Sequence, residues 1–200
     1  LDDIVHSLGL TRRANHHPLF DIAFGYHRRH ILRIDLTECT VARIKLPSRI
    51  SKFDLLLEAI EDDDGLLLRF EYMQTIFRGD YIERLAGHLL RLLSQIGEDP
   101  HRCIEDYRLL SAADEKRHNA DAKVPQPVRD ETGIRLALPT DFIRPKVLSP
   151  KRQTERTQLH RTHWQTLQQI AVQGEFRMYT ILLSIYSLLL SRLSGQDDFT

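Results

Sequence analysis

The chain has 200 residues, of which 42% are hydrophobic and 28% are charged, and its formal net charge is zero. This length suits one domain or two small ones, and a zero net charge gives no overall attraction to nucleic acid or to an anionic membrane. Cys39 and Cys103 lie far apart, with no secretory leader before them, so we expect reduced thiols in a cytoplasmic protein. The longest apolar run, 181–193, is shorter than the roughly 20 residues that cross a bilayer. We therefore expect a buried helix there and no membrane span.

Alternating apolar residues predict strands in the first half of the chain. Residues 20–26, FDIAFGY, alternate cleanly, and 31–36 and 42–46 have the pattern of further short strands. Residues 51–73 contain two apolar runs around Asp64-Gly65, a dipeptide that suits a tight turn, so they predict a β-hairpin. We expect one shared β core made of Phe20, Phe24, Phe53, Leu55, Phe70 and Tyr72.

Apolar stripes at helical spacing predict three helices in the rest of the chain. The first covers 80–100, with Asp80 and Glu83 spaced as a capping box. Two more are expected near the end, one ending near Gly174 and the other near Gly195. Between the first and second helices, 112–134 and 139–158 are polar and proline-containing, which predicts linkers. We expect the helix over 181–193 to pack on the hairpin and on the first helix, because its leucines would otherwise be exposed.

The stretch HHPLFDIAFG, residues 16–25, contains the candidate acid–base residues. His16 and His17 stand five and four residues before Asp21, which resembles the His-His-x-x-x-Asp-Gly signature of acyl-transferring condensation enzymes. Ile22 takes the place of the glycine, and neighbours on an alternating segment face opposite sides. The local residues therefore favour a loop leading into a buried strand, with His17 as the remaining catalytic candidate.

Other polar motifs favour structural roles over chemistry. The histidine pairs of HRRH, 27–30, and HRTH, 160–163, have no evident third metal ligand nearby, so solvated surface is favoured over a metal site. The basic stretch 151–163 suits phosphate contact but has no interleaved aromatics for stacking on bases. Asp54 would need an arginine or a backbone turn as its partner if its strand is buried, and Arg69 on the partner strand is a candidate. We expect neither a metal nor a nucleic-acid partner.

Longer segments resemble a known family. RRANHHPLFDIAFGY, SKFDLLLEAIEDDDGLLLRFEYMQTIF and the helix with the exit segment up to about residue 115 resemble, in order and spacing, the end of nonribosomal peptide synthetase condensation domains. LALPTDFIRPK and MYTILLSIYSLLLSRLSGQDDFT resemble segments that come earlier in the C-terminal lobe of the same family. The resemblance implies three parts: the end of a lobe in 1–115, a linker in 116–133 and the beginning of a lobe in 134–200.

This resemblance implies an α/β fold, namely a partial chloramphenicol-acetyltransferase-like lobe with a mixed sheet and packed helices. The family joins carrier-bound aminoacyl and peptidyl thioesters through an amide bond, and their phosphopantetheine arms enter a tunnel between two lobes. HHPLF aligns with a strand entry in the C-terminal lobe, whereas the catalytic signature belongs to the other lobe. The resemblance therefore transfers no catalytic role to His17 or Asp21.

The expected function is accordingly that of a synthetase fragment in secondary metabolite biosynthesis, inactive alone. It would bind no cofactor directly and would work with peptidyl or aminoacyl carrier proteins and adjoining synthetase domains. Two alternatives stay open: a non-catalytic module that docks carrier proteins, and a stand-alone acyltransferase that uses His17 as its base. The absence of a complete two-lobe layout argues against the stand-alone acyltransferase.

Overall fold

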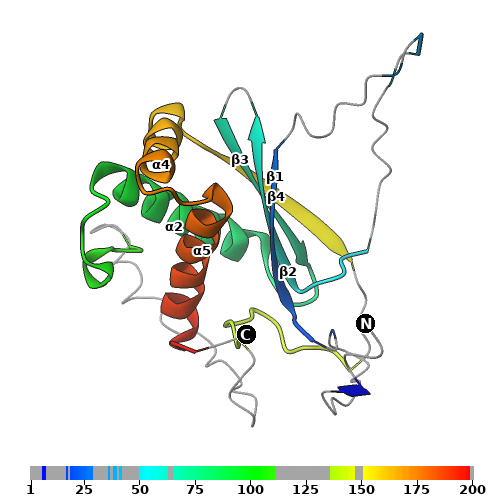
Figure 1. The fold of residues 1–200 in the computed structure, drawn as a ribbon. Coiled ribbons are helices and arrows are strands. Elements are labelled where there is room, and N and C mark those ends of the chain that lie inside the picture. The colour runs from blue at the N-terminus through cyan, green and yellow to red at the C-terminus, as the bar shows by residue number, and fades with distance from the viewer. Residues whose placement is uncertain are drawn as a thin grey trace.

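The structure is a computed structural model, and it describes residues 6–7, 17, 19–28, 36, 38–39, 41, 50–62, 65–110, 136–146 and 151–198. Within these residues a four-stranded sheet carries three α-helices on one of its faces, as Figure 1 shows. Apart from isolated residues, the strands expected at 31–36 and 42–46 lie outside the described part of the chain, and so does the linker expected at 116–133.

The sheet has the strand order β1-β2-β3-β4. β1 (Ile22–Arg28) runs parallel to β2 (Leu55–Asp62), which pairs antiparallel with β3 (Gly65–Met73). The mixed α/β sheet and the hairpin are therefore confirmed. Gly65, with φ of 141°, opens β3 opposite Asp62, and the two residues that join the strands lie outside the described part.

The fourth strand corrects a prediction. β4 (Arg152–Leu159) lies in the stretch expected to be a linker, and it pairs antiparallel with β3 from Leu66↔Leu159 to Met73↔Arg152. Its sequence, RQTERTQL, has no apolar alternation because the strand lies at the edge of the sheet and most of its side chains are only partly buried or exposed. Backbone hydrogen bonds to β3 hold this strand in place. Such bonds leave no pattern in the side chains that a sequence could show.

The three predicted helices are confirmed as α2 (Gly79–Glu98), α4 (Arg161–Gln173) and α5 (Met178–Ser194). α5 ends at Gly195, whose φ of 67° is the left-handed conformation that glycine adopts without strain. Among the described residues no single helix is long and apolar enough to cross a membrane, although α4 and α5 meet that test together across a bend of 116°.

The capping box predicted at the start of α2 is wrong. Arg78 is the N-cap residue, and its backbone N–H donates to Asp141 Oδ2 at 2.8 Å. Asp80 instead accepts hydrogen bonds from the side chains of Arg78 and Arg84. The cap is therefore supplied by a residue that lies 63 positions away in the chain.

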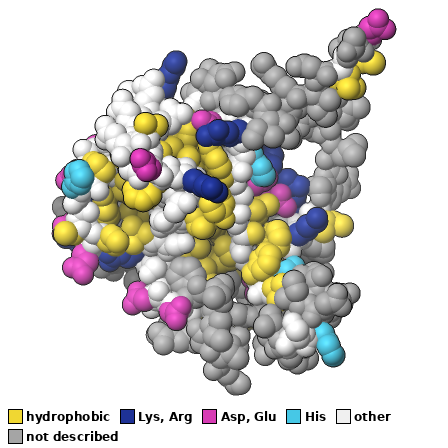
Figure 2. Space-filling view, viewed as in Figure 1, with side chains coloured by type: hydrophobic (Ala, Val, Ile, Leu, Met, Phe, Trp, Pro, Cys, Tyr) yellow, Lys and Arg dark blue, Asp and Glu magenta, His cyan; other side chains and the backbone are white. Residues whose placement is uncertain are grey.

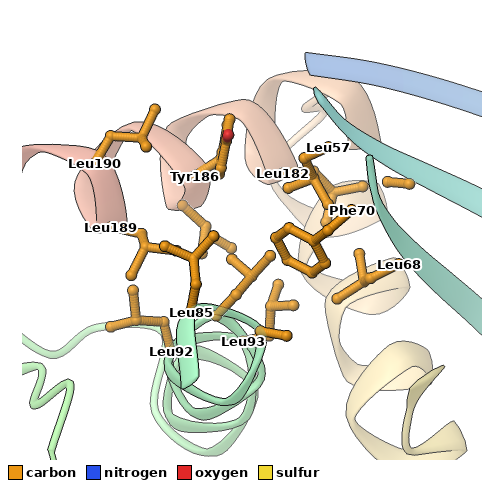
Figure 3. Packing of buried hydrophobic residues seen from close by; sticks show 14 of the residues in the cluster. Leu57, Leu68, Phe70, Leu85, Leu92, Leu93, Leu182, Tyr186, Leu189 and Leu190 are labelled. Atoms are coloured by element: carbon orange, nitrogen blue, oxygen red, sulfur yellow. The ribbon is translucent and has the colours of Figure 1, made fainter. Parts of the chain in front are cut away.

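The core lies between the sheet and the helices. Figure 3 shows Leu57 and Phe70 of the sheet facing α5 and α2, with Leu189 of α5 above Leu85 and Leu92 of α2. Each fully buried side chain of this size contributes roughly 1.5–3 kcal/mol. The prediction that the two family-like regions pack on each other around residues 181–193 is confirmed.

Two of the predicted core aromatics lie elsewhere. Phe20 is 39% exposed, Phe53 is half-buried, and their rings stack on each other with centroids 5.3 Å apart. Both precede their strands, because β1 begins at Ile22 and β2 begins at Leu55. Leu55, Phe70 and Tyr72 are fully buried, and the half-buried Phe24 packs against them.

A buried ion pair ties the C-terminal region to the entry of β2. The Arg144 guanidinium donates to both carboxylate oxygens of Asp54, with Nη1 3.1 Å from Oδ1. The two side chains are 17% and 10% exposed. The expected partner, Arg69, instead pairs with Glu58 directly across the β2–β3 ladder. A carboxylate at this depth requires such a partner.

Replacing Arg144 with methionine should lower the free energy of unfolding by about 3–5 kcal/mol, because it leaves the buried Asp54 carboxylate without its arginine. Arg78→Met is the matched control, since that arginine pairs with Asp80 in solvent and its loss should cost less than about 1 kcal/mol. Urea unfolding followed by circular dichroism measures both values. Equal costs for the two variants would contradict a structural role for the buried pair.

Candidate functional site

His17 and Asp21 form a closed turn just before β1. The backbone N–H of His17 donates to Asp21 Oδ1 at 3.2 Å. In return, His17 Nδ1 accepts the backbone N–H groups of Leu19 at 3.4 Å and Phe20 at 3.3 Å. The imidazole and the carboxylate therefore satisfy backbone groups at this entry to the strand, much as side chains do in Asx turns.

The His17 ring is also packed between aromatic side chains. Its centroid lies 4.7 Å from that of Phe20 and 5.5 Å from that of Phe53. Nδ1 must carry a lone pair to accept the two N–H groups, so both contacts of the turn depend on this ring nitrogen. This geometry suits a structural residue. The neighbouring candidate, His16, lies outside the described residues.

An apolar cavity lies beside this turn, between β1 and α5. It has a volume of about 220 Å³ and is lined by Ile22 and Phe24 on the strand and by Leu183, Tyr186 and Leu190 on the helix. Figure 2 shows hydrophobic side chains gathered in this region. Burial raises the pKa of the Tyr186 hydroxyl, so this group stays protonated. The cavity suits an apolar group better than acid–base chemistry.

Sequence reasoning missed this cavity because its two walls come from opposite ends of the chain. One signal was present: Leu183 and Ser187 lie on the side of α5 away from Leu182, Ile185 and Leu189, which the core buries. An almost wholly apolar helix with only one buried face leaves apolar surface on its other face.

The histidine pairs contact other groups in the structure. His27 Nε2 lies 3.5 Å from Glu58 Oε1, while His30 is outside the described residues. His160 caps α4 by accepting the Thr162 N–H, and His163 Nδ1 lies 3.3 Å from Ser94 Oγ. Nowhere in the described residues do three or more histidine, cysteine, aspartate or glutamate side chains gather as a metal site would require.

The helix-free face of the sheet carries charged side chains in pairs. Arg69 pairs with Glu58, and Arg152 NH2 lies 2.9 Å from Glu71 Oε2. Glu71 is buried, and burial raises the pKa of its carboxyl group, although Arg152 opposes that rise. Arg152 and Arg156, from the basic stretch noted in the sequence, lie on this face of β4 and do not form a separate basic arm.

If His17 closes the turn, His17→Ala should lower the free energy of unfolding by about 0.5–1.5 kcal/mol, because two N–H groups lose their acceptor. His17→Asn is the matched variant, since its amide oxygen accepts the same N–H groups in an Asx turn. It should recover part of the loss in a thermal or urea unfolding experiment. Equal destabilisation by both variants would show that the acceptor atom is unimportant.

Stability should also depend on the protonation of Glu71. A carboxyl whose pKa is raised on folding stabilises the folded chain fully below its unfolded pKa, and that contribution is lost as pH rises through the folded pKa. Glu71→Gln mimics the protonated form. Its stability relative to the parent chain should therefore increase between about pH 4 and pH 7, as measured by urea unfolding across that range. A relative stability that falls with pH would reverse the assignment.

Comparison with known proteins shows which sequences this chain is similar to. The chain is 34% identical over 110 residues to bacitracin synthase 3 of Bacillus licheniformis, which covers 55% of the chain and 2% of that protein. It is 35% identical over 117 residues to gramicidin S synthase 2 of Brevibacillus brevis, covering 58% of the chain and 3% of the synthase. Surfactin synthase subunit 2 of Bacillus subtilis (strain 168) is 28% identical over 123 residues, or 59% of the chain and 3% of the subunit.

No solved structure matched the chain with significance. The chain spans only 2–3% of the length of the curated relatives named above. The statistical model of the condensation domain matches residues 1–117, which is more than half of the chain. This matched region contains β1, β2, β3 and α2, so the resemblance found in HHPLF and in the hairpin is confirmed. The chain therefore belongs to the condensation domain family of nonribosomal peptide synthetases.

Proposed function

We propose that the chain is a fragment of a nonribosomal peptide synthetase condensation domain that does not form amide bonds by itself. The observation that carries this proposal is the single sheet: every named strand of the described residues belongs to it. In the family that the sequence resembles, substrates meet in a tunnel between two lobes. One sheet with helices on one face supplies a single wall for such a tunnel.

The geometry of His17 supports the same conclusion. A general base must accept a proton from the attacking amine, and His17 Nδ1 already accepts two backbone N–H groups. The ring is also wedged against Phe20 and Phe53. A stand-alone acyltransferase based on His17 is therefore the weaker candidate.

The proposed domain limits follow the sequence resemblance. Residues 1–115 are the end of a condensation-domain C-terminal lobe, 116–133 are a linker, and 134–200 are the beginning of such a lobe. Support comes from the way the last segment joins the first: β4 extends the sheet beside β3, and α5 contributes to the same core as α2. The resulting unit is a partial chloramphenicol-acetyltransferase-like lobe.

The proposed partners are carrier proteins and the adjoining domains of a synthetase. The carrier, not this chain, would hold the phosphopantetheine arm, and we propose no cofactor and no metal for the chain itself. The proposed location is cytoplasmic, in keeping with two exposed cysteines that form no disulfide. We propose no nucleic-acid and no membrane partner, because the net charge is zero and two arginines of the sheet face, Arg69 and Arg152, are paired with carboxylates.

The direct test mixes the chain with a donor and an acceptor, both loaded on carrier proteins, and seeks the amide product by mass spectrometry. We expect product only at the rate of uncatalysed aminolysis, because the described residues supply a single wall of such a tunnel. An intact condensation domain with the same substrates is the positive control.

One outcome would contradict this proposal, and a second would favour the alternative of a docking module over an inactive fragment. Product above background that disappears in His17→Ala but not in Asp21→Asn, a variant of the same turn that keeps the imidazole, would identify a stand-alone acyltransferase. Saturable binding of loaded carrier protein without product would identify a docking module, and isothermal titration of the loaded and unloaded carrier measures it.

A further inference from the structure

The chain turns back on itself directly after α2. The helix ends at Glu98, and the residues that follow, 99–110, return to the C-terminal half of the same helix and bond to its side chains. We call residues 99–110 the strap, and Figure 1 shows it as the bright green segment beyond the end of α2. It contains a single 3₁₀ turn, Ile104–Asp106.

Gln95 of α2 holds the strap by its backbone. The side-chain Nε2 donates to the Arg108 carbonyl at 2.8 Å, and Oε1 accepts the Arg108 N–H at 3.1 Å. About two helical turns earlier, His88 Nδ1 lies 2.9 Å from the carbonyl oxygen of Leu109. Gln95 therefore meets both backbone groups of one residue, as a residue of a neighbouring β-strand does in a hydrogen-bonded antiparallel pair.

The strap places few apolar side chains in the core. Of its twelve residues only Tyr107 is buried, and Leu109 and Leu110 are half-buried. Ile104 is 64% exposed. α2, in contrast, has six buried residues. A segment with little buried apolar surface, held mainly by hydrogen bonds to its backbone, opens at a lower free energy than the core beside it.

α5 holds the strap at a second point. Arg192, in the last turn of α5, donates from Nη2 to the Ile104 carbonyl at 3.1 Å. This bond also goes to the backbone and lies at an exposed position. The strap therefore joins one helix from each of the two family-like regions by contacts that do not involve its own side chains.

The position of the strap sets the length of the connection between these regions. The next segment that the structure describes, 136–146, caps the other end of α2 through Asp141 and Arg78. α2 has 20 residues, so the chain must return over about 30 Å of helix. Release of the twelve strap residues would add up to roughly 40 Å of extended chain to that connection.

We propose that the strap opens and closes on α2 as one unit while the core stays folded, and that Gln95 is the residue that holds it closed. In the closed state the chain leaves α2 along the helix and the connection to 136–146 is short. In the open state the connection gains the length of the strap. This device does not rest on the proposed lack of catalysis, because it uses only α2, α5 and the chain between them.

Amide hydrogen exchange of the whole chain, followed by NMR, tests the opening. The Arg108 N–H is protected while Gln95 Oε1 accepts it, whereas the N–H of the buried Leu89 in α2 reports unfolding of the core. The Arg108 amide should exchange faster than that of Leu89. Its exchange should also depend little on urea at concentrations below the unfolding transition, because a local opening exposes little surface.

Gln95→Ala removes both bonds to Arg108 and should speed exchange of that amide by roughly five- to thirtyfold, the effect of one or two hydrogen bonds. The Leu89 amide should keep its rate within about threefold, since alanine is a good helix former. Gln169→Ala is the matched control, because it makes the same change at an exposed position of α4. It should leave both amides within that range.

Brief digestion with trypsin gives a readout that a single lost bond does not change. Cleavage after Arg108 requires an open strap, because the carbonyls of Arg108 and Leu109 are held by α2 when it is closed. Proteolysis of a briefly opened segment follows the population of the open state. This cut, identified by mass spectrometry, should therefore form faster in Gln95→Ala than in the parent chain and in Gln169→Ala.

Three results would overturn the proposal. An Arg108 amide with the same exchange rate and urea dependence as that of Leu89 would show that the strap opens only when the core unfolds. An unprotected Arg108 amide in the parent chain would show that the strap is not held closed. Cleavage after Arg108 at equal rates in Gln95→Ala and Gln169→Ala would show that Gln95 does not hold it.

Discussion

The backbone ladder between β3 and β4 is the interaction on which the rest of the structure depends. It runs through eight residue pairs, from Leu66↔Leu159 to Met73↔Arg152, and it joins segments more than 70 residues apart. β4 leads directly into α4, and α5 follows, so the ladder fixes where both helices meet the sheet. Without this ladder, the apolar side of α2 and the face of β3 that packs against the helices would lose their partners. The reason is that α4 and α5 supply much of the core that buries them. The region that matches the family, 1–117, is therefore completed by the region that follows it.

The ion pair between Asp54 and Arg144 and the cap from Asp141 to Arg78 act at the same junction. Both join the segment 136–146 to the ends of elements in the N-terminal half. A buried ion pair adds little net stability over an apolar pair, because desolvation offsets the attraction between the charges. Its geometric demand is strict, however, since the guanidinium must meet both carboxylate oxygens. We infer that these polar contacts fix where the segment lies, while apolar burial supplies most of the energy.

Periodic segments were predictable from the sequence, and contacts between distant segments were not. The stripe in 80–96, the apolar run in 181–193 and the hairpin at 55–73 depend on local spacing, and all three formed as expected. β4 escaped prediction because RQTERTQL has no apolar alternation and is held by backbone bonds to β3. The partner of Asp54 was misassigned because Arg69 is close in sequence, whereas Arg144 lies 90 residues away. The cavity between β1 and α5 was missed because its two walls also come from distant parts of the chain.

The turn at His17 shows how side chains of a motif that resembles a catalytic signature can bond backbone groups. The aspartate four residues after the histidine accepts the histidine's N–H, and the imidazole accepts two N–H groups in return. A strand that enters a sheet after a loop leaves such N–H groups without ladder partners, and here side-chain atoms accept them at a partly exposed position. A histidine and an aspartate four residues apart can accept these N–H groups whether or not a substrate binds nearby. The residues of this turn therefore carry information about how β1 is held.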